Sequence, residues 1–459
     1  MNQSSSTIRP EIWTSRSAFL MASIGAAVGL GNIWRFPYIA GVNGGSGFVL
    51  IYIGFVFLLG LPVMVGEMVI GRRGKENAIA SVKSLVEQEG GASFWRVIGW
   101  LSIAIPFLGL SYYSVVAAWS MDYLGSAATG AFSDFTSQTS ADNFSAKIEK
   151  SVQQVLLHGA FIAVTVIVVA RGVQGGIEKV TKIAMPALLA ILVFLVGYNA
   201  VTSNFSEALH FLFEPDFSQI GGTEVLMALG QALFSLAIGV GAIITYSAYM
   251  PREFSLPESA AIICIGDTTV ALLAGLAIFP LVFQFGLAPS EGPGLIFITL
   301  PIAFGEMPGG QIIGTLFFLL LFFAAFTTAI GMLEPVVAWL IRALGLSRPK
   351  IAVGAGVGVW VVGIVSVLSF GLMQGVHPLG IVPGLEAKTF FDILDFTVAN
   401  IMLPINALLI SLFVGWAVRK ATICDELSIS ENIWLTYWRF AVRYLVPIAM
   451  LGIFYDLWS

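Results

Sequence analysis

Residues 26–37 read AAVGLGNIWRFP and stand inside an apolar segment long enough to cross a lipid bilayer. A segment of this kind, about 20 residues long, normally forms one continuous helix. Three glycines and two polar side chains interrupt it here: Gly25, Gly29, Gly31, Asn32 and Arg35. The first two glycines also fit a close-packing face between helices. Because polar side chains share the segment, we favour a helix that is broken around a polar cavity.

The rest of the chain has the composition of a membrane protein. Of its 459 residues 57% are hydrophobic and only 11% are charged, against roughly 25% charged residues in a soluble domain. Apolar segments of spanning length occur at 17–40, 46–70, 97–124, 153–171, 180–202, 224–250, 257–285, 311–342, 350–373, 391–418 and 435–457. We therefore predict an all-α membrane protein with 11 transmembrane helices and no separate soluble domain.

The basic residues predict how the chain is oriented. If alternate connections face opposite sides, nearly all of the 22 Lys and Arg residues share the side of residues 1–16; the exceptions are Arg35, Lys147, Lys150 and Lys388. This side should be cytoplasmic. We expect a multi-pass protein of the cell (inner) membrane, with a cytoplasmic N-terminal segment at 1–16 and the C-terminus outside. The first apolar segment is too long for the core of a cleaved signal peptide.

A second interrupted segment suggests an internal repeat. Gly239 and Gly241 break the sixth apolar segment as the earlier glycines break the first. Matched interruptions in two halves of a chain indicate a transport site at their interface. We expect inverted halves at about 17–202 and 224–418, with an extra helix at 435–457, inside one transport domain at 17–457.

These motifs closely resemble the neurotransmitter:sodium symporter family. The resemblance rests on residues 26–37, Asn43-Gly44-Gly45, residues 230–235 (GQALFS), residues 239–246 (GVGAIITY) and residues 324–328 (AAFTT). It spans the first ten segments, and the chain is most similar to bacterial carriers of hydrophobic amino acids. The resemblance implies a leucine-transporter-like fold, with a 5+5 inverted repeat and broken helices 1 and 6. It also implies sodium-coupled symport by alternating access.

Two Na⁺ sites follow from the resemblance. The first would use Ala27, Asn32, Ser235 and Asp267 together with the substrate carboxylate. The second would use the carbonyls of Gly25, Val28 and Ala324 and the hydroxyls of Thr327 and Thr328. Threonine hydroxyls in membrane helices also bond back to their own helix, which is the alternative for this pair.

Asp267 departs from the family pattern, because relatives commonly carry Asn there. An Asp in the bilayer interior costs roughly 2.5–3.5 kcal/mol unless it is compensated. An ionised Asp267 would offset one of the two sodium charges, as a chloride does in chloride-dependent relatives. Tyr52, Gln231 and Ser235 of the chloride position remain, but its position in the seventh segment is Ala271. We therefore predict chloride-independent transport; a protonated Asp267 bonded within the helix packing is the alternative.

The resemblance also places the substrate. The N–H groups of Leu30 and Gly31 and the hydroxyl of Tyr113 would hold its carboxylate. Monoamine carriers have an Asp where this chain has Gly29, so the substrate should bring its own carboxylate. Its side chain would meet Gly109, Phe234, Ala237, Val240 and Met332.

The composition of this pocket predicts the substrate class. Gly109 and Val240 are smaller than their counterparts in the bacterial leucine carrier, and Met332 can repack around several shapes. We expect hydrophobic or aromatic L-amino acids as substrates, and no protein or nucleic-acid partner besides the lipid bilayer.

Gates and a hinge complete the expectations. Arg35 and Asp395 resemble the outer ion pair of the family, with Phe234 as a lid. At the inner side Trp13 and Tyr249 match the family. Arg342 replaces the usual Asp there, and Arg9 lies nearest the expected arginine, so packing and acids such as Glu11 would close this gate. Gly176 and Pro186 would let the cytoplasmic half of the fifth segment unwind.

Other function classes find little support in the sequence. It lacks the nucleophile–base pair or metal motif of an intramembrane enzyme, and its three histidines have no metal-ligand spacing. We see no continuous polar path for a channel. A sodium-independent exchanger or amino acid sensor on the same scaffold is the alternative function, and Asn32, Asp267 and Thr327 speak against it.

Overall fold

The computed structural model describes residues 11–287, 293–382 and 384–458. In these ranges the elements are α-helices and short 3-10 or π-helical turns, and none is a strand. Nine helices of the described residues are long and apolar enough to cross a membrane, or ten if one bent pair counts as a single span. The predicted all-α membrane class is confirmed, whereas the count of 11 spans is not. Arg9, named above for the inner gate, and residues 288–292 lie outside the described residues.

The first part of the chain forms the elements α1 (Arg16–Ala27), η1 (Gly31–Arg35), α2 (Phe36–Val42), α3 (Ser46–Phe55), η2 (Val56–Gly60), α4 (Leu61–Gly74), α5 (Ala78–Glu89), η3 (Ser93–Arg96), α6 (Val97–Ala128), α7 (Ser137–Ile148), α8 (Ser151–Ala170), η4 (Val173–Ile177), α9 (Glu178–Thr202) and α10 (Phe205–Phe213). Short polar side chains cap the N-termini of several of these helices. Asn77 accepts the N–H of Ala80 at the start of α5, and Thr136 and Thr139 form a capping box on α7.

The second part forms α11 (Gly222–Ser235), α12 (Ala242–Ala248), α13 (Leu256–Gln284), η5 (Leu295–Thr299), α14 (Leu300–Glu306), α15 (Gly310–Leu344), α16 (Arg348–Leu368), α17 (Phe390–Phe396), η6 (Thr397–Met402), α18 (Leu403–Leu412), η7 (Phe413–Ala417), α19 (Lys420–Leu427), α20 (Ile433–Phe440), η8 (Ala441–Leu445) and α21 (Val446–Trp458). The last three elements form one continuous helix, and its residues Ile433–Tyr455 are long and apolar enough to cross a membrane.

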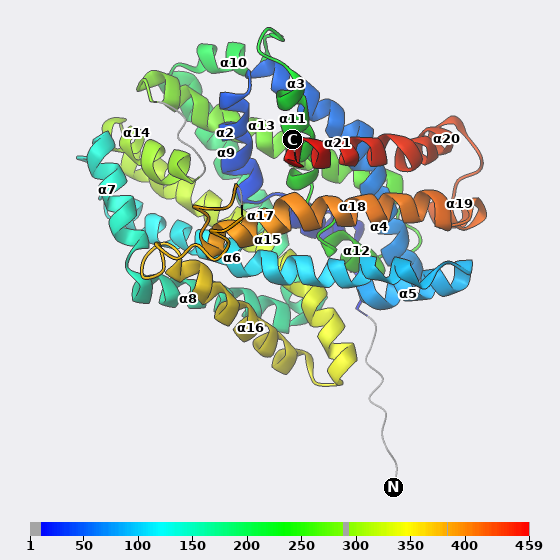
Figure 1. Cartoon of the computed structure of the whole chain (residues 1–459). Coiled ribbons are helices and arrows are strands. Elements are labelled where there is room, and N and C mark those ends of the chain that lie inside the picture. The colour runs from blue at the N-terminus through cyan, green and yellow to red at the C-terminus, as the bar shows by residue number, and fades with distance from the viewer. Residues whose placement is uncertain (1–10, 288–292, 383, 459) are drawn as a thin grey trace.

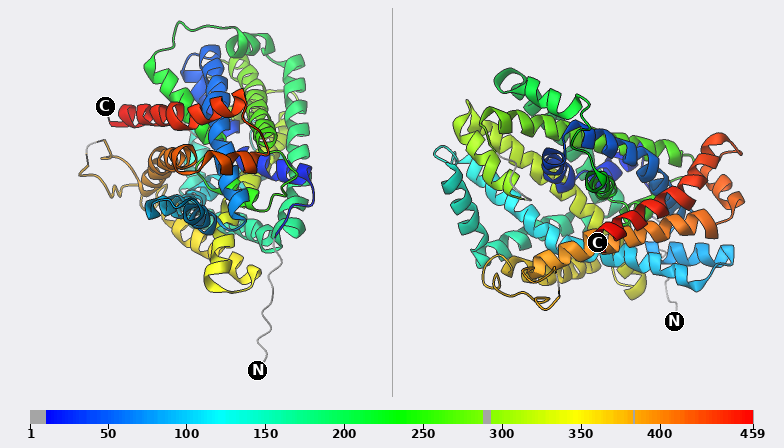
Figure 2. Two further views of the ribbon diagram at one scale, coloured as in Figure 1. Left: turned by 90° about the vertical axis from the view of Figure 1, so that its right-hand side faces the viewer. Right: turned by 45° about the horizontal axis from the view of Figure 1, so that its top comes forward.

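Two long helices run through the middle of the bundle. α6 has 32 residues and α15 has 35, and they pack along each other. In Figure 1 α6 reaches from the end that holds α5, α19 and α20 to the opposite end, where α7 and α14 lie. The left view of Figure 2 looks onto the first of these ends. The bundle therefore has two distinct ends joined by long apolar helices.

The chain leaves helical geometry at two places near the centre. α1 and the helix Gly31–Val42 are bent by 56° at the break between them. Between α11 and α12, three residues have positive φ: Ala237 at 51°, Gly239 at 84° and Gly241 at 90°. A Cβ on Gly241 would lie 2.4 Å from the Ser102 carbonyl oxygen, so only glycine fits there.

Buried side chains satisfy the backbone of the second break. The N–H of Gly239 donates to Glu67 Oε1 at 2.6 Å, and the Gly239 carbonyl accepts from Asn406 Nδ2 at 2.7 Å. Glu67 and Asn406 are both fully buried. Non-helical backbone is tolerated at membrane depth only where protein groups or a polar cavity satisfy it. Side chains of the surrounding helices therefore stabilise the non-helical backbone at this break.

Candidate ion and substrate site

Asn32 connects the first break to two other helices. Its amide oxygen accepts the N–H of Gly29 at 3.0 Å. Its amide nitrogen donates to Ser235 Oγ of α11 at 2.9 Å and to Asp267 Oδ1 of α13 at 2.8 Å. Ser235 Oγ donates to Asp267 Oδ2 at 2.5 Å and accepts from Tyr52 Oη at 3.2 Å. The structure thus brings together three residues that were predicted for the first sodium site; the fourth, Ala27, is the last residue of α1.

Thr328 of α15 faces the end of α1. Its hydroxyl donates to the carbonyls of Gly25 at 3.3 Å and Val28 at 3.1 Å. The hydroxyl of Thr327 instead donates within its own helix, at 3.2 Å to the carbonyl of Ala324. Thr328 therefore joins α15 to the first break, and Thr327 has the back-bonded arrangement that was the alternative for this pair.

The oxygen atoms of these two clusters suit a hard monovalent cation. Asp267 is 0% exposed, and its bonded partners are the neutral groups of Asn32 and Ser235. In the described ranges no group of three or more His, Cys, Asp or Glu side chains is placed to hold a metal ion. One carboxylate among amide, hydroxyl and carbonyl oxygens is a poor ligand set for zinc and a suitable one for Na⁺.

Tyr113 of α6 reaches the first break from the other side. Its hydroxyl accepts the N–H of Leu30 at 3.3 Å. A Cβ on Gly29 would lie 2.9 Å from Tyr113 Oη, and a Cβ on Gly31 would lie 2.9 Å from the Phe234 ring. Glycine at these positions therefore keeps room between the two breaks.

The residues predicted to meet the substrate side chain come from three helices and the second break. Gly109 of α6 faces α15, where a Cβ on Gly109 would lie 2.7 Å from Met332 Cε. Ala237 and Val240 lie in the second break, and Phe234 lies in the last turn of α11. Three helices and one break thus supply this set.

At the outer side, Arg35 contacts an aromatic ring and not the predicted acid. Its guanidinium carbon lies 4.1 Å from the centroid of the Phe234 ring, a cation–π contact. Asp395 lies near enough to interact electrostatically with both Arg35 and Tyr112. The structure describes both side chains, and no ion pair within 4.0 Å joins Arg35 to Asp395.

The contacts of the predicted inner gate centre on Trp13. Its indole nitrogen donates to the Tyr246 carbonyl at 2.8 Å, and its N–H donates to the Tyr249 carbonyl at 3.2 Å. Tyr249 Oη donates to Glu334 at 3.0 Å. The predicted neighbours Trp13 and Tyr249 are therefore in contact, and an acid of α15 joins them.

An ion-pair cluster surrounds this inner contact. Arg348 pairs with the buried Glu334 and, at 3.3 Å, with Glu11. Arg342 pairs with Glu76 at the end of α4. Sequence reasoning named Glu11 but missed Glu334 and Arg348. An acid inside an apolar segment was the available signal for Glu334.

The predicted hinge lies where the chain is tightly packed. Gly176 belongs to the π-helical turn η4, and a Cβ there would lie 2.0 Å from the Val168 carbonyl oxygen. Pro186 lies inside α9. The buried Glu178 accepts the N–H of Thr14 at 2.8 Å and its hydroxyl at 2.5 Å. The start of α9 is thus bonded to the segment that carries Trp13.

The fold and the site together define a multi-pass membrane transporter built around a central, oxygen-lined pair of breaks. The chain belongs to the sodium:neurotransmitter symporter family, whose model matches residues 10–154 and 138–457. This confirms the family predicted from the sequence, and with it a sodium-dependent transporter rather than an enzyme.

Relatives extend over the whole chain. It is 40% identical over 452 residues to the "Uncharacterized sodium-dependent transporter YhdH" of Bacillus subtilis, covering 98% of each chain. It is 33% identical to an uncharacterized sodium-dependent transporter of Haemophilus influenzae, covering 97% of each. Among solved structures, it is similar to MhsT in complex with L-phenylalanine, with a TM-score of 0.88, 38% identity and coverage of 97% of this chain and 99% of that one.

Proposed function

We propose that this protein imports hydrophobic or aromatic L-amino acids together with Na⁺, by alternating access and without chloride. The observation that carries the proposal is the buried carboxylate of Asp267, bonded to Asn32 and Ser235 where the two breaks approach each other. A carboxylate in the bilayer interior is expensive unless a cation or a proton compensates it. Sodium that binds there together with the substrate would couple the transport of both to the same conformational change.

Two sodium ions would bind on either side of the first break. The first would take Ala27, Asn32, Ser235, Asp267 and the substrate carboxylate as ligands. The second would take Gly25, Val28, Ala324, Thr327 and Thr328. The convergence of Thr328 on the Gly25 and Val28 carbonyls supports the second site. Binding there requires the hydroxyls of Thr327 and Thr328 to turn their oxygen lone pairs toward the ion.

The substrate would lie between the two breaks. Its carboxylate would accept hydrogen bonds from Tyr113 Oη and from the N–H groups of Leu30 and Gly31. Its side chain would meet Gly109, Phe234, Ala237, Val240 and Met332, with Gly29 leaving room. The L-phenylalanine in the MhsT structure, which is 38% identical in sequence, supports an aromatic or large aliphatic side chain.

We further propose the architecture that this cycle needs. The two breaks would belong to helices 1 and 6 of 11, in inverted halves at about 17–202 and 224–418 with an extra helix at 435–457, all in one transport domain. The N-terminus would be cytoplasmic and the C-terminus outside. Arg35, Phe234 and Asp395 would close the outer side, and Trp13 and Tyr249 the inner side. Gly176 and Pro186 would let the start of the fifth helix unwind.

Binding and uptake by the reconstituted protein test the function. We expect radiolabelled L-tryptophan, L-phenylalanine and L-leucine to bind in sodium medium and not in potassium medium, with glycine and alanine competing poorly. Uptake into proteoliposomes should persist when gluconate replaces chloride. Equal binding in sodium and potassium media would identify a sodium-independent exchanger or sensor instead, and uptake that stops in gluconate would reject the role of Asp267 in replacing chloride.

A further inference from the structure

A basic groove lies between α19 and the last long helix, away from the transport site. It has a volume of about 450 Å³, and Lys420, Thr436, Arg439, Phe440, Arg443 and Tyr444 line it. Nothing in the proposed transport cycle uses these residues. The helices α19 and α20, which carry part of its lining, lie at the end of the bundle that also holds α5 (Figures 1 and 2).

Positive charge in the groove exceeds negative charge. Lys420 pairs with Glu431 at 2.6 Å, and this carboxylate is 74% exposed. Arg439 and Arg443 stand four residues apart on one helix, where like charges repel. In the described part of the chain neither of them forms an ion pair with a carboxylate within 4.0 Å. Two guanidinium charges are therefore left for an anion from outside the chain.

One of these guanidinium groups is also short of a hydrogen-bond acceptor. Arg439 Nη1 is buried and has no partner among the described residues. Arg443 is fixed by its own contacts, because its Nε donates to the Gly415 carbonyl at 2.6 Å and its guanidinium lies 4.9 Å from the Trp416 ring centroid. Buried donors are almost always paired, so the free nitrogen indicates an acceptor that binds in the groove.

The surroundings of the groove indicate where such an anion comes from. Phe440, Tyr444, Ile448 and Leu451 follow one another at helical spacing on the last helix and are exposed, as is Trp416 opposite. Exposed aromatic residues beside basic ones are typical of the membrane–water interface, and the aliphatic residues that follow suit acyl chains. A phospholipid would contact both the basic groove and the exposed apolar residues beside it, whereas a free phosphate would contact the basic groove alone.

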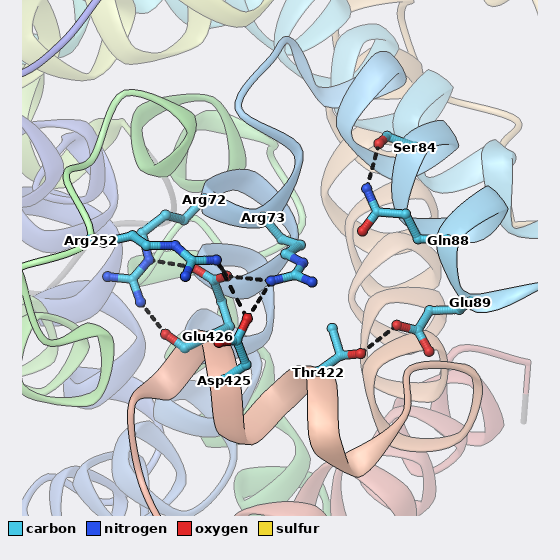
Figure 3. A network of polar contacts seen from close by, with 9 residues as sticks. All are labelled: Arg72, Arg73, Ser84, Gln88, Glu89, Arg252, Thr422, Asp425 and Glu426. Atoms are coloured by element: carbon cyan, nitrogen blue, oxygen red, sulfur yellow. Dashed lines mark hydrogen bonds and ion pairs between the residues drawn. The ribbon is translucent and has the colours of Figure 1, made fainter.

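We propose that this groove binds the headgroup phosphate of one anionic phospholipid, with its acyl chains along Ile448 and Leu451. Arg439 and Arg443 supply the charge-assisted hydrogen bonds, and Lys420 closes the groove from α19. Basic pockets beside transmembrane helices are a known way to hold anionic headgroups. The lipid joins α19 to the last helix, and arginines of other segments hold the C-terminal turn of α19 (Figure 3).

Lipid binding to the purified full-length protein tests the proposal. Native mass spectrometry would compare phosphatidylglycerol with phosphatidylcholine of the same acyl chains. We expect one phosphatidylglycerol to be retained in preference, and Arg439→Gln with Arg443→Gln to weaken it by about fivefold for each removed charge. The matched control Lys83→Gln with Lys350→Gln removes two exposed charges elsewhere and should change nothing.

Three further results decide between the alternatives. Equal retention of the two lipids by the unmodified protein, or an equal loss in the control, would overturn the proposal. Displacement of phosphatidylglycerol by millimolar inorganic phosphate would assign the groove to a free anion and also overturn it. If the double variant does not fold, the exposed Lys420→Gln should still weaken phosphatidylglycerol by about fivefold, and unchanged retention would again count against a lipid site.

Discussion

We propose that coupling to sodium depends on Asp267. Its carboxylate is fully buried and is bonded to Asn32 and Ser235, which come from two other segments. Neutral donors stabilise a carboxylate less than a cation does. The folded protein should therefore be under electrostatic strain at this residue when sodium is absent.

Asp267→Asn tests this expectation. The variant removes the charge but keeps the size and one oxygen, so it should stabilise the protein in potassium medium by about 1–3 kcal/mol, up to the cost of the buried acid. Sodium should then raise the melting temperature less than in the unmodified protein, because only the second proposed site keeps its full ligand set. Thermal unfolding in sodium and potassium media would measure both effects, with the exposed Asp142→Asn as the control. A variant that sodium still stabilises as strongly as the unmodified protein would contradict the assignment.

We expect Gly109 to set the size of the proposed side-chain pocket. A Cβ there would lie 2.7 Å from the terminal methyl of Met332, which is flexible and can move into the pocket. We expect Gly109→Ala to weaken L-tryptophan binding by about 10-fold or more while L-leucine changes little, since one methyl group in a pocket is worth roughly 1–3 kcal/mol. Competition binding would measure the ratio.

A second substitution controls for indirect effects of Gly109→Ala. Adding Met332→Ala restores the lost volume and should recover much of the L-tryptophan affinity. Equal losses for both amino acids, without recovery in the double variant, would place Gly109 outside the pocket.

At the scale of elements, α19 is held to the bundle by arginines. Arg72 of α4 and Glu426 of α19 are 2% and 1% exposed and lie 2.6 Å apart. Arg72 also donates to the Phe254 carbonyl at 2.5 Å. The exposed Asp425 pairs with Arg73 at 2.5 Å and with Arg252 at 3.4 Å (Figure 3). The hydrogen bond from Arg73 lowers the pKa of Asp425, so this surface pair stays ionised further into the acid range than a free aspartate would.

Glu426→Gln and Asp425→Asn form a matched pair of variants on α19. Glu426→Gln leaves the buried Arg72 without a counter-charge and should destabilise the protein by about 3–5 kcal/mol. Asp425→Asn removes an exposed pair and should cost about 1 kcal/mol or less. Thermal or denaturant unfolding of the reconstituted protein would compare them, and similar losses in both variants would show that burial does not decide the strength of this contact.

The start of α9 should respond to the occupancy of the second proposed sodium site. Gly176 is tightly packed against the end of α8, and Glu178 holds Thr14. When sodium leaves, we expect residues 173–186 to open and exchange faster, because the π-helical turn and Pro186 leave fewer backbone bonds to break. Hydrogen–deuterium exchange in sodium and potassium media would measure this change. Exchange that does not depend on sodium would argue against a hinge here, and α16 provides an internal control.

At the scale of the whole molecule, the orientation of the two termini follows from the number of spans. The structure gives nine or ten candidate spans in its described residues, and the segment at 224–250 is divided between α11 and α12. If α11 and α12 together cross the membrane once, the chain crosses 11 times and its ends lie on opposite sides. Reporter fusions after residue 459 should then be active outside the cell, and those before residue 1 inside. Two ends on the same side would require an even number of spans.

The sequence by itself determined the class, the family and the positions of both breaks. Long apolar segments, glycine interruptions and isolated polar residues are local features, because lipid requires each spanning segment to satisfy its own backbone. It also indicated Asn32, Ser235 and Asp267, which the structure brings into contact. The inner cluster of Glu334 and Arg348 had only a weak local signal, an acid inside an apolar segment.

Tertiary structure alone decided which distant groups meet. Three sets of contacts join segments that are far apart in the chain. They are the hydrogen bonds of Gly239 with Asn406 and Glu67, the contact of Arg35 with Phe234, and the ion pair between α19 and α4. Their partners are chosen by helix packing, which brings a donor and an acceptor together wherever the interior leaves no water to replace either of them. No local pattern in the sequence indicates which of these distant groups pair.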